Sequence, residues 1–337
     1  MIKDSITIVF ATDANYSLYT SIAISSILEN GNPSTYYQFV ILISSDFSEE
    51  CRHLTIKTVS SFENSEVNFV EAGTIFDNSH IGISHITTPT YYRLLLPSIL
   101  QNIDECLYLD SDIVVCGDLS ELFNIDISNY YVAGVKAPWY ILQRETIGSK
   151  ESKDLIPTDR YINAGVLLMN LDKIRRDGID KKFIEFSTQE FVSQDQDIVN
   201  VSCYDAILHL PLRYNTMTKF YDTDRVELEK VFSADEIEAA FQNPLIIHYA
   251  DRVKPWQDMT IPFADRWWGA LKKCKAFCDY CEQLMRNQIL QNKKLIRRYR
   301  IANEENIRIK QSITFRVGKV VLWLPRTVKN TFMRLIR

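Results

Sequence analysis

Short apolar runs alternate with stretches of helical pattern over the first 250 residues of the 337-residue chain. The runs are five to seven residues long and rich in Val, Ile and Leu, which is typical of strands buried on both faces. We expect strands at 6–11, 38–44, 67–72, 105–109, 131–137, 164–170, 207–212 and 244–250.

Helices are predicted between the first four strands. Asn15 can cap a helix over 16–29, Ser48 opens another over 49–62, and Thr88-Pro89 begins a third that runs to about Leu100. Strands that alternate with helices predict an α/β fold with a mixed, mostly parallel sheet and helices on both faces.

Ligands of such sheets bind beyond the carboxyl ends of the strands, so polar residues beside the apolar runs are candidates for a site. Because strand ends meet at one edge, these residues can converge although they are far apart in the sequence. They are Asp13 and Asn15, Asp110 and Asp112, Asn163 just before its run, and His248 near the end of the last run.

The segment Asp110-Ser111-Asp112 follows a buried strand directly. Two carboxylates on a tight turn offer hard oxygen ligands, which suit Mg²⁺ or Mn²⁺. The alternative is a turn in which each Asp bonds to the local backbone. An imidazole from His248 could complete a shell for Mn²⁺, or it could be a hydrogen-bonded core histidine. Lys254 could face a diphosphate as a point charge, or it could be solvated.

Three further segments have both a functional and a structural interpretation. Asp13 and Asn15 could contact the edge of a base on which Tyr16 stacks, or they could form a turn and a helix cap. The small pair Ala164-Gly165 could let a ligand approach the backbone, or it could pack against a helix.

The third segment is Asp195-Gln196-Asp197, which precedes an amphipathic helical stretch. These side chains could hold sugar hydroxyls beside a reacting carbon. The alternative is that the acidic residues complement the dipole at the start of a helix.

Composition adds a contrast within the chain. Apolar residues make up 46% and charged residues 24%, as in an ordinary globular protein. The net charge is −5, yet residues 286–337 contain 14 Lys or Arg against two Glu. We therefore expect two parts, a domain over 1–264 and a helical, basic and aromatic extension over 265–337.

The cellular setting is predicted from negative evidence. The seven cysteines form no paired framework, which favours reduced thiols in a cytoplasm. The N-terminal apolar run is too short for a signal peptide, and no window approaches eighteen uninterrupted apolar residues.

Taken together and in this order, six segments resemble the retaining glycosyltransferases of family 8. The segments are FATDANY, SHITTPTYYRLLLP, YLDSDIVVCGDL, YINAGVLLMNL, DQDIVN and HYADRVKPW, between about residues 6 and 256. The resemblance implies a nucleotide-diphospho-sugar transferase fold of the GT-A kind, a UDP-sugar donor and Mn²⁺, with Mg²⁺ as the alternative cation.

The resemblance also implies roles for individual residues. It assigns the cation to Asp110, Asp112 and His248, and the position under the anomeric carbon to Gln196, between Asp195 and Asp197. His85 matches a position on the acceptor side. The donor site would comprise Ala11, Asp13, Asn15, Tyr16, Arg93, Ser111, Asn163, Ala164, Gly165 and Lys254.

Gln196 is a poor nucleophile, so we expect front-face attack in which the departing phosphate takes the proton of the acceptor. One departure concerns Asp251, which stands where the family often has Gly beside the diphosphate. A carboxylate there would repel the diphosphate unless its side chain turns away.

The expected function is transfer of galactose or glucose from a UDP-sugar to a glycan or lipid-linked saccharide in bacterial surface polysaccharide or lipopolysaccharide synthesis. The alternatives are a non-catalytic sugar-nucleotide-binding protein and a nucleotidyltransferase, although the latter would have a Gly-rich N-terminal loop. The basic and aromatic composition of the extension favours contact with an anionic membrane surface at the cytoplasmic face. The alternatives are that the extension is a packed helical segment or a nucleic-acid surface. Of these, the nucleic-acid surface is the least favoured, so no nucleic-acid partner is expected.

Overall fold

The structure is a computed structural model that describes residues 5–45, 47–73, 88–142, 159–189, 191–274, 290, 293–305, 307, 308 and 311. By their contacts, the residues form two compact units, 1–277 and 278–337, which are considered separately. The candidate site lies in the first unit.

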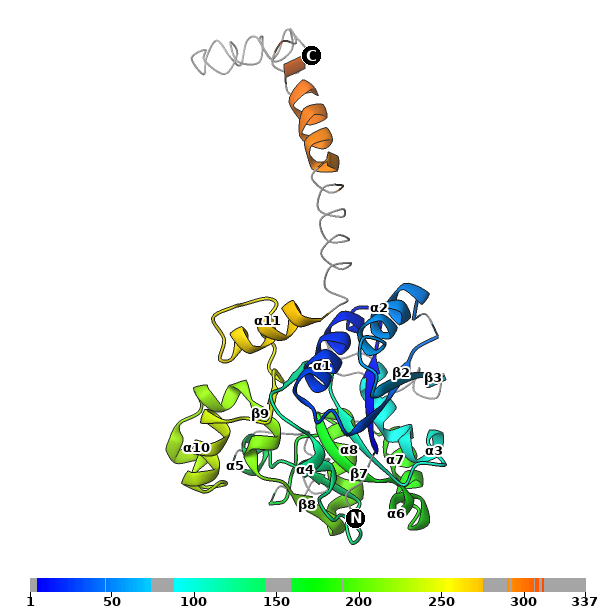
Figure 1. Cartoon of the computed structure of the whole chain (residues 1–337). Coiled ribbons are helices and arrows are strands. Elements are labelled where there is room, and N and C mark those ends of the chain that lie inside the picture. Colours follow the sequence, from blue (N-terminus) through cyan, green and yellow to red (C-terminus); the bar gives the residue numbers. More distant parts are fainter. Residues whose placement is uncertain are drawn as a thin grey trace, which may run out of the picture. The chain divides into compact units, whose positions relative to one another are not determined.

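A seven-stranded sheet forms the centre of the first unit (Figure 1). Its order is β3-β2-β1-β4-β7-β6-β8, and every neighbouring pair is parallel except the two pairs made by β7. The mixed, mostly parallel sheet is therefore confirmed. The strands are β1 (Ser5–Thr12), β2 (Tyr36–Ile43), β3 (Ser65–Glu71), β4 (Glu105–Leu109), β6 (Val132–Gly134), β7 (Val166–Asn170) and β8 (Ile207–His209).

A second, three-stranded sheet has the order β5-β10-β9. Its strands are β5 (Ile113–Val115), β9 (Thr216–Met217) and β10 (Ile246–His248). His248 pairs with Ile113 on one side and with Met217 on the other. This pairing holds the end of β10 against the turn that contains the two aspartates.

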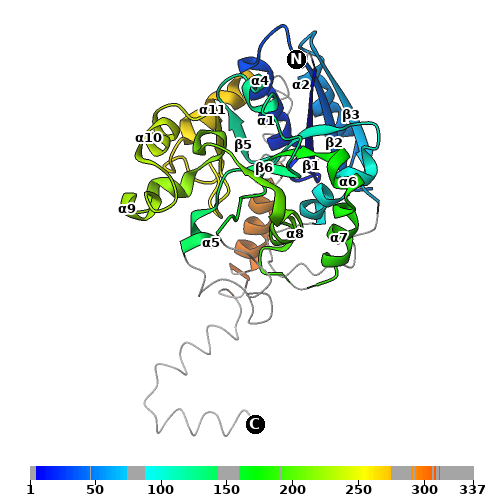
Figure 2. The same ribbon diagram turned by 90° about the horizontal axis from the view of Figure 1, so that it is seen from below.

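Helices cover both faces of the central sheet, as the sequence predicts (Figure 2). Side chains alternate between the two faces along each strand, so neighbouring residues of one strand pack against different sets of helices. Ile8 and Phe10 pack with one set, α1 (Ser17–Asn30), α2 (Glu49–Val59) and α4 (Ser120–Phe123). Val9 packs with the other set, which comprises η1 (Thr88–Leu95), α3 (Leu96–Ile99), α6 (Leu171–Arg176), α7 (Ile179–Phe186) and α8 (Gln194–Cys203). The remaining elements are α5 (Pro138–Leu142), η2 (Tyr204–Ala206), η3 (Leu212–Asn215), η4 (Thr218–Asp222), α9 (Arg225–Leu228), α10 (Ala234–Gln242) and α11 (Ala264–Lys273).

The helix predicted from Thr88 to about Leu100 is confirmed in its extent, but it is 3₁₀-helical over Thr88–Leu95 and α-helical only over Leu96–Ile99. The predicted cap of α1 is wrong. Asn15 does not cap α1, because the Asp13 carboxylate accepts the backbone N–H groups of Asn15 and Tyr16, at 2.9 and 3.0 Å. Asp13 therefore closes the turn itself, as Asp commonly does.

Helix α11 packs within the first unit, although the sequence suggested that the extension begins at 265. Its Trp267 is 2% exposed and lies against Trp256, with ring centroids 5.3 Å apart, and against Tyr19 of α1 at 6.2 Å. An indole of this size contributes several kcal/mol when it is buried.

In the second unit, residues 293–305 are helical and exposed. Within the part of the chain that the structure describes, no helix combines the length and the apolar character that a membrane crossing requires.

We predict that Trp267→Ala lowers the free energy of unfolding by about 3–5 kcal/mol, the usual cost of removing a buried large aromatic side chain. Urea unfolding followed by circular dichroism measures the change. Trp268→Ala is the matched control, because this neighbouring indole is only partly buried. Equal effects of the two substitutions would contradict the packing of α11.

Candidate active site

The predicted residues meet at one edge of the central sheet, in a pocket of about 510 Å³. The carboxyl ends of β1 and β4 lie beside the amino end of β7, because β7 runs antiparallel to β4. The backbone N–H of Asp110 donates to the carbonyl of Gly165 at 2.8 Å, which joins the two strand ends. This reversal explains why Asn163, Ala164 and Gly165 precede their strand whereas Asp13 and Asp110 follow theirs.

Most of the predicted site residues line this pocket. It contains Ala11, Asp13, Tyr16, Arg93, Asp110, Ser111, Asp112, Asn163, Ala164, Gly165, Asp195, Gln196, His248 and Lys254. Asn15 is exposed and Asp197 is fully buried, and neither lines the pocket. His85 lies outside the described residues.

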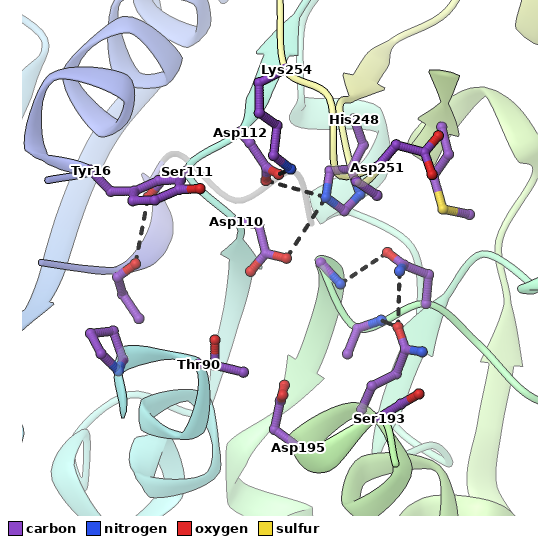
Figure 3. A pocket seen from close by; sticks show the side chains of 18 of the residues that line it. Tyr16, Thr90, Asp110, Ser111, Asp112, Ser193, Asp195, His248, Asp251 and Lys254 are labelled. Atoms are coloured by element: carbon purple, nitrogen blue, oxygen red, sulfur yellow. Dashed lines mark hydrogen bonds and ion pairs between the residues drawn. The ribbon is translucent and has the colours of Figure 1, made fainter. Parts of the chain in front are cut away.

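Asp110, Asp112 and His248 form a candidate metal centre (Figure 3). Each residue offers one ligand atom, and these atoms lie within 4.8 Å of one another. His248 Nε2 is 3.3 Å from Asp112 Oδ1 and 3.7 Å from Asp110 Oδ2. One imidazole nitrogen and two carboxylates fit a hard or borderline divalent cation such as Mn²⁺.

Gly165 leaves the space that this centre needs. A Cβ atom at residue 165 would lie 2.2 Å from His248 Cε1 and 2.6 Å from Asp110 Oδ2. Both distances are far shorter than any van der Waals contact. Two of the three candidate ligands would have to move if this residue carried a side chain.

Lys254 lies beside Asp112, from a loop that follows β10. Its Nζ donates to Asp112 Oδ2 and to the carbonyl of Tyr249, both at 2.6 Å. Burial favours the neutral form of Asp112, but the Lys254 ammonium outweighs burial and holds the pKa of this carboxyl well below its usual range. Asp112 is therefore an anion at neutral pH.

Arg93 connects the candidate metal centre with Asp195. Its guanidinium contacts Asp110 Oδ1 at 2.7 Å and Asp195 Oδ2 at 2.8 Å, and it lies over the Tyr108 ring at 4.4 Å. Burial raises the pKa of Asp195 to about 7, although the Arg93 guanidinium opposes this rise. The buried cation thus contacts two of the acidic groups of the pocket at once.

Gln196 and Asp197 have their oxygen atoms engaged by protein donors. Gln196 Oε1 accepts from Asn163 Nδ2 at 2.9 Å and from the Ala164 N–H at 3.1 Å. Asp197 accepts from the Tyr161 hydroxyl and from the Ser193 N–H, the latter at 2.7 Å. Asp197 therefore orders the segment around Gln196 and does not face the pocket.

Aromatic side chains lie at the opposite end of the pocket from Asp195. Tyr16 contacts Trp256 edge to face, with ring centroids 6.3 Å apart, and Trp256 stacks on Tyr19 at 3.8 Å. Ser111 also lines the pocket, and its hydroxyl forms a hydrogen bond with the Thr20 hydroxyl at 2.8 Å, in which either group can be the donor. This end of the pocket offers a flat apolar surface with polar atoms around it.

Several pocket residues were not predicted from the sequence. Lys219 Nζ lies 4.6 Å from the centre of the Trp139 ring, and Tyr140 stacks on Tyr161 at 4.2 Å. An aromatic pair that directly follows a predicted strand, as Trp139-Tyr140 does, was the one available signal. Asn215 does not line the pocket but contacts His248, and it carried no signal, because a single Asn beside a short apolar run is common in loops.

Asp251 also lines the pocket. Figure 3 shows its carboxylate pointing away from Asp110 and Asp112. Its side chain is turned away, which is the arrangement that avoids repulsion between this carboxylate and an anion held at the two aspartates.

Comparison with known proteins adds independent information. A sequence model of glycosyl transferase family 8 matches residues 7–260. General stress protein A of Bacillus subtilis is 27% identical over 82% of the chain and 96% of its own length. Lipopolysaccharide 1,2-glucosyltransferase of Escherichia coli is 26% identical over 76% of the chain and 74% of its own length.

Among solved structures, the galactosyltransferase LgtC in complex with donor and acceptor sugar analogs has a TM-score of 0.65 and 25% identity, covering 80% of the chain and 96% of that protein. This likeness confirms the GT-A fold that the motifs implied. Other relatives are longer: the chain spans 60% of two of them, and 51% of a structurally similar bifunctional glycosyltransferase.

We predict that Gly165→Ala weakens cation binding, because the added methyl group displaces His248 and Asp110. Electron paramagnetic resonance of free Mn²⁺, titrated with the protein, measures this loss as at least a ~10-fold weaker affinity. Gly269→Ala is the control, since a Cβ there meets no atom within 4 Å. Unchanged Mn²⁺ affinity in Gly165→Ala would contradict the assignment of the centre.

Proposed function

The chain belongs to glycosyl transferase family 8, and we propose that it moves galactose or glucose from a UDP-sugar to a glycan or lipid-linked saccharide, with retention of anomeric configuration. The observation that carries this proposal is the placement of Asp110, Asp112 and His248 in one pocket with Asp195 and Gln196. A cation site suits the diphosphate of a nucleotide-diphospho-sugar, and the polar side chains of Asp195 and Gln196 beside it suit the hydroxyl groups of the sugar.

The uridine occupies the aromatic end of the pocket in this proposal. Tyr16 offers its ring face for stacking, and Trp256 supports that ring from its edge. Asp13 and the strand end at Ala11 line the same end and offer polar atoms to the base and ribose. Stacking of this kind contributes about 1–3 kcal/mol for each base.

The diphosphate lies between the aromatic end and Gln196. Lys254 is placed beside it through its contact with Asp112 and supplies a positive charge. Asp110, Asp112 and His248 would hold Mn²⁺ or Mg²⁺, which when bound supplies Lewis-acid stabilisation of the charge on the departing UDP.

The hexose lies against Asp195 and Asn163 in this proposal, with Gln196 under its reacting carbon. Gln196 Oε1 already accepts two hydrogen bonds, and both oxygens of Asp197 are engaged by Tyr161 and Ser193. Neither side chain is therefore disposed to act as a nucleophile. These contacts support front-face attack, in which the departing phosphate accepts the proton of the acceptor hydroxyl.

The acceptor saccharide binds on the wall formed by Trp139, Tyr140, Met217 and Lys219, which lies on the Gln196 side of the pocket. Tyr140 stacks on Tyr161, whose hydroxyl accepts from Gln196, so this wall adjoins the reacting centre. Aromatic faces suit the apolar face of a sugar ring.

We predict that UDP is released from UDP-galactose or UDP-glucose only in the presence of Mn²⁺ or Mg²⁺, and that chelator abolishes this release. Asp112→Asn should reduce the release at least ~100-fold, because the cation ligand and the partner of Lys254 are lost together. Asp172→Asn, an exposed carboxylate on α6, is the control and should leave release unchanged.

Three other outcomes would redirect the proposal. Binding of UDP without release, in the presence of simple saccharides, would favour a sugar-nucleotide sensor. Formation of a UDP-sugar from UTP and a sugar phosphate would favour a nucleotidyltransferase. A sugar ester trapped on Asp195 or Asp197 and seen by mass spectrometry would replace front-face attack with a covalent intermediate.

We infer that the enzyme acts in bacterial surface polysaccharide or lipopolysaccharide synthesis, in the cytoplasm and on the inner face of the plasma membrane. The helix at 293–305 supports this, since it exposes Leu295 and Tyr299, four residues apart on one face, among Arg297, Arg298 and Arg300. Basic residues near an anionic surface contribute about 1 kcal/mol each.

We predict that the full chain sediments with phosphatidylglycerol vesicles at low salt and dissociates as salt rises. The double substitution Arg297→Glu and Arg298→Glu should weaken binding by at least ~10-fold. Lys181→Glu with Lys182→Glu makes the same charge change in α7 and serves as the control. Failure to sediment at low salt would refute the membrane proposal.

A further inference from the structure

A line of hydrogen bonds between side chains leads from the candidate metal ligand His248 through Asn215 and Asn163 to Gln196. His248 Nδ1 lies 3.0 Å from Asn215 Oδ1, and Asn215 Nδ2 lies 2.8 Å from Asn163 Oδ1. Asn163 Nδ2 in turn donates to Gln196 Oε1 at 2.9 Å. Asn215 is 0% exposed and stands at the end of η3, so only side-chain and backbone groups of the protein surround it.

The direction of this line is set by two backbone N–H groups. The Gly165 N–H donates to the side-chain atom of Asn163 that faces Asn215, at 3.0 Å. A backbone N–H can only donate, so that Asn163 atom must be the oxygen. The Ala164 N–H donates to Gln196 Oε1 at 3.1 Å and fixes the Gln196 amide by the same logic.

The orientation of the Asn163 amide determines that of the Asn215 amide, which in turn determines which nitrogen of His248 carries the proton. Asn163 presents an oxygen to Asn215, so Asn215 must present its NH₂ group to Asn163 and its oxygen to His248. An oxygen acceptor opposite Nδ1 requires that Nδ1 carries the proton of the neutral ring. The lone pair of the ring is therefore on Nε2, the nitrogen that faces Asp110 and Asp112 at 3.7 and 3.3 Å.

We propose that Asn215 is a positioning residue that fixes His248 as the Nδ1–H tautomer for cation binding and, through Asn163, ties the candidate metal centre to Gln196. The second part rests on the proposed function, because Gln196 has a role only if a sugar is transferred there. The first part concerns the tautomer and the cation alone.

A purely structural role for Asn215 makes a different prediction. If the residue only filled space and satisfied buried polar groups, its replacement would lower stability without selecting a nitrogen of His248. The two roles are therefore separated by measurements of the imidazole and of the bound cation rather than by stability.

Two substitutions of Asn215 distinguish its contact with His248 from its contact with Asn163. Asn215→Leu keeps the number and branching of the side-chain heavy atoms but offers no acceptor to Nδ1–H and no donor to Asn163. Asn215→Asp keeps an acceptor for Nδ1–H but sets a carboxylate oxygen against Asn163 Oδ1, where two acceptors repel. Thr216→Val is the matched control, since it removes one buried hydroxyl from the next residue, 3.4 Å from the Leu212 carbonyl, outside this line.

Three measurements on the full chain decide the first part. Imidazole ¹⁵N shifts of the metal-free protein, with His248 assigned through His248→Gln, should show Nδ1–H in wild type and Asn215→Asp but a mixture in Asn215→Leu. Mn²⁺ affinity measured by electron paramagnetic resonance, without any nucleotide, should fall ~10–100-fold in Asn215→Leu. It should stay within about 3-fold of wild type in Asn215→Asp and Thr216→Val.

The second part is decided by turnover. Asn215→Asp should bind Mn²⁺ normally yet release UDP at least ~10-fold more slowly at saturating donor, because Gln196 and Asn163 lose their fixed placement. Wild-type turnover in Asn215→Asp would overturn this link.

A wild-type His248 whose Nδ1 carries no proton, or wild-type Mn²⁺ affinity in Asn215→Leu, would overturn the tautomer assignment. If Asn215→Leu does not fold, the wild-type ¹⁵N spectrum still tests the tautomer of His248, and turnover of Asn215→Asp still tests the link to Gln196. Absence of UDP release in every variant, with the predicted tautomer and Mn²⁺ affinities, would refute the proposed function and leave the tautomer assignment standing.

Discussion

Charge compensation at one buried sheet edge is the constraint on which the rest of the site depends. Asp110, Asp112 and Asp195 all lie there with little exposure, and a buried carboxylate without a partner costs several kcal/mol. Arg93 and Lys254 offset this cost from two segments that are distant in the sequence. The 3₁₀ segment that carries Arg93 and the loop that carries Lys254 must therefore close on the same edge for these acidic side chains to have cationic partners.

The reversed strand β7 makes this closure possible. An antiparallel strand brings the segment before it, and not the one after it, to the edge where β1 and β4 end. That segment contributes Gly165, whose missing side chain leaves room for His248, and two backbone N–H groups that orient Asn163 and Gln196. The antiparallel direction of β7 therefore provides both the room for the His248 ring and the backbone N–H groups that orient the Asn163 and Gln196 amides.

The pocket has two aromatic surfaces because two sets of elements meet across it. Tyr16 and Trp256 come from the start of α1 and the loop after β10, whereas Trp139 and Tyr140 come from α5. Polar and charged groups lie between these aromatic surfaces. This arrangement suits a substrate with a flat ring, a charged middle and a sugar, and a second sugar beyond it.

The sequence by itself determined much of the fold and named most of the candidate residues that the structure brings into one pocket. Apolar runs located β1, β2, β3 and β4 to within two residues. For β1, β2 and β4 the reason is that a strand buried on both faces leaves an almost unbroken apolar signal. The residues beside those runs were found for the same reason, since strand ends at one edge must converge. The family resemblance added Arg93, which has no signal of its own, and assigned Gln196 its position under the reacting carbon.

Tertiary structure alone decided how these residues share their partners. Asp197 and Asn15 look like site residues in the sequence, but one binds Tyr161 and Ser193 and the other is held by Asp13. Asn215 looks like a loop residue, yet it bonds to His248 and Asn163. Hydrogen bonds between distant segments depend on distances of a few tenths of an ångström, and a linear pattern of residue types contains no such distances.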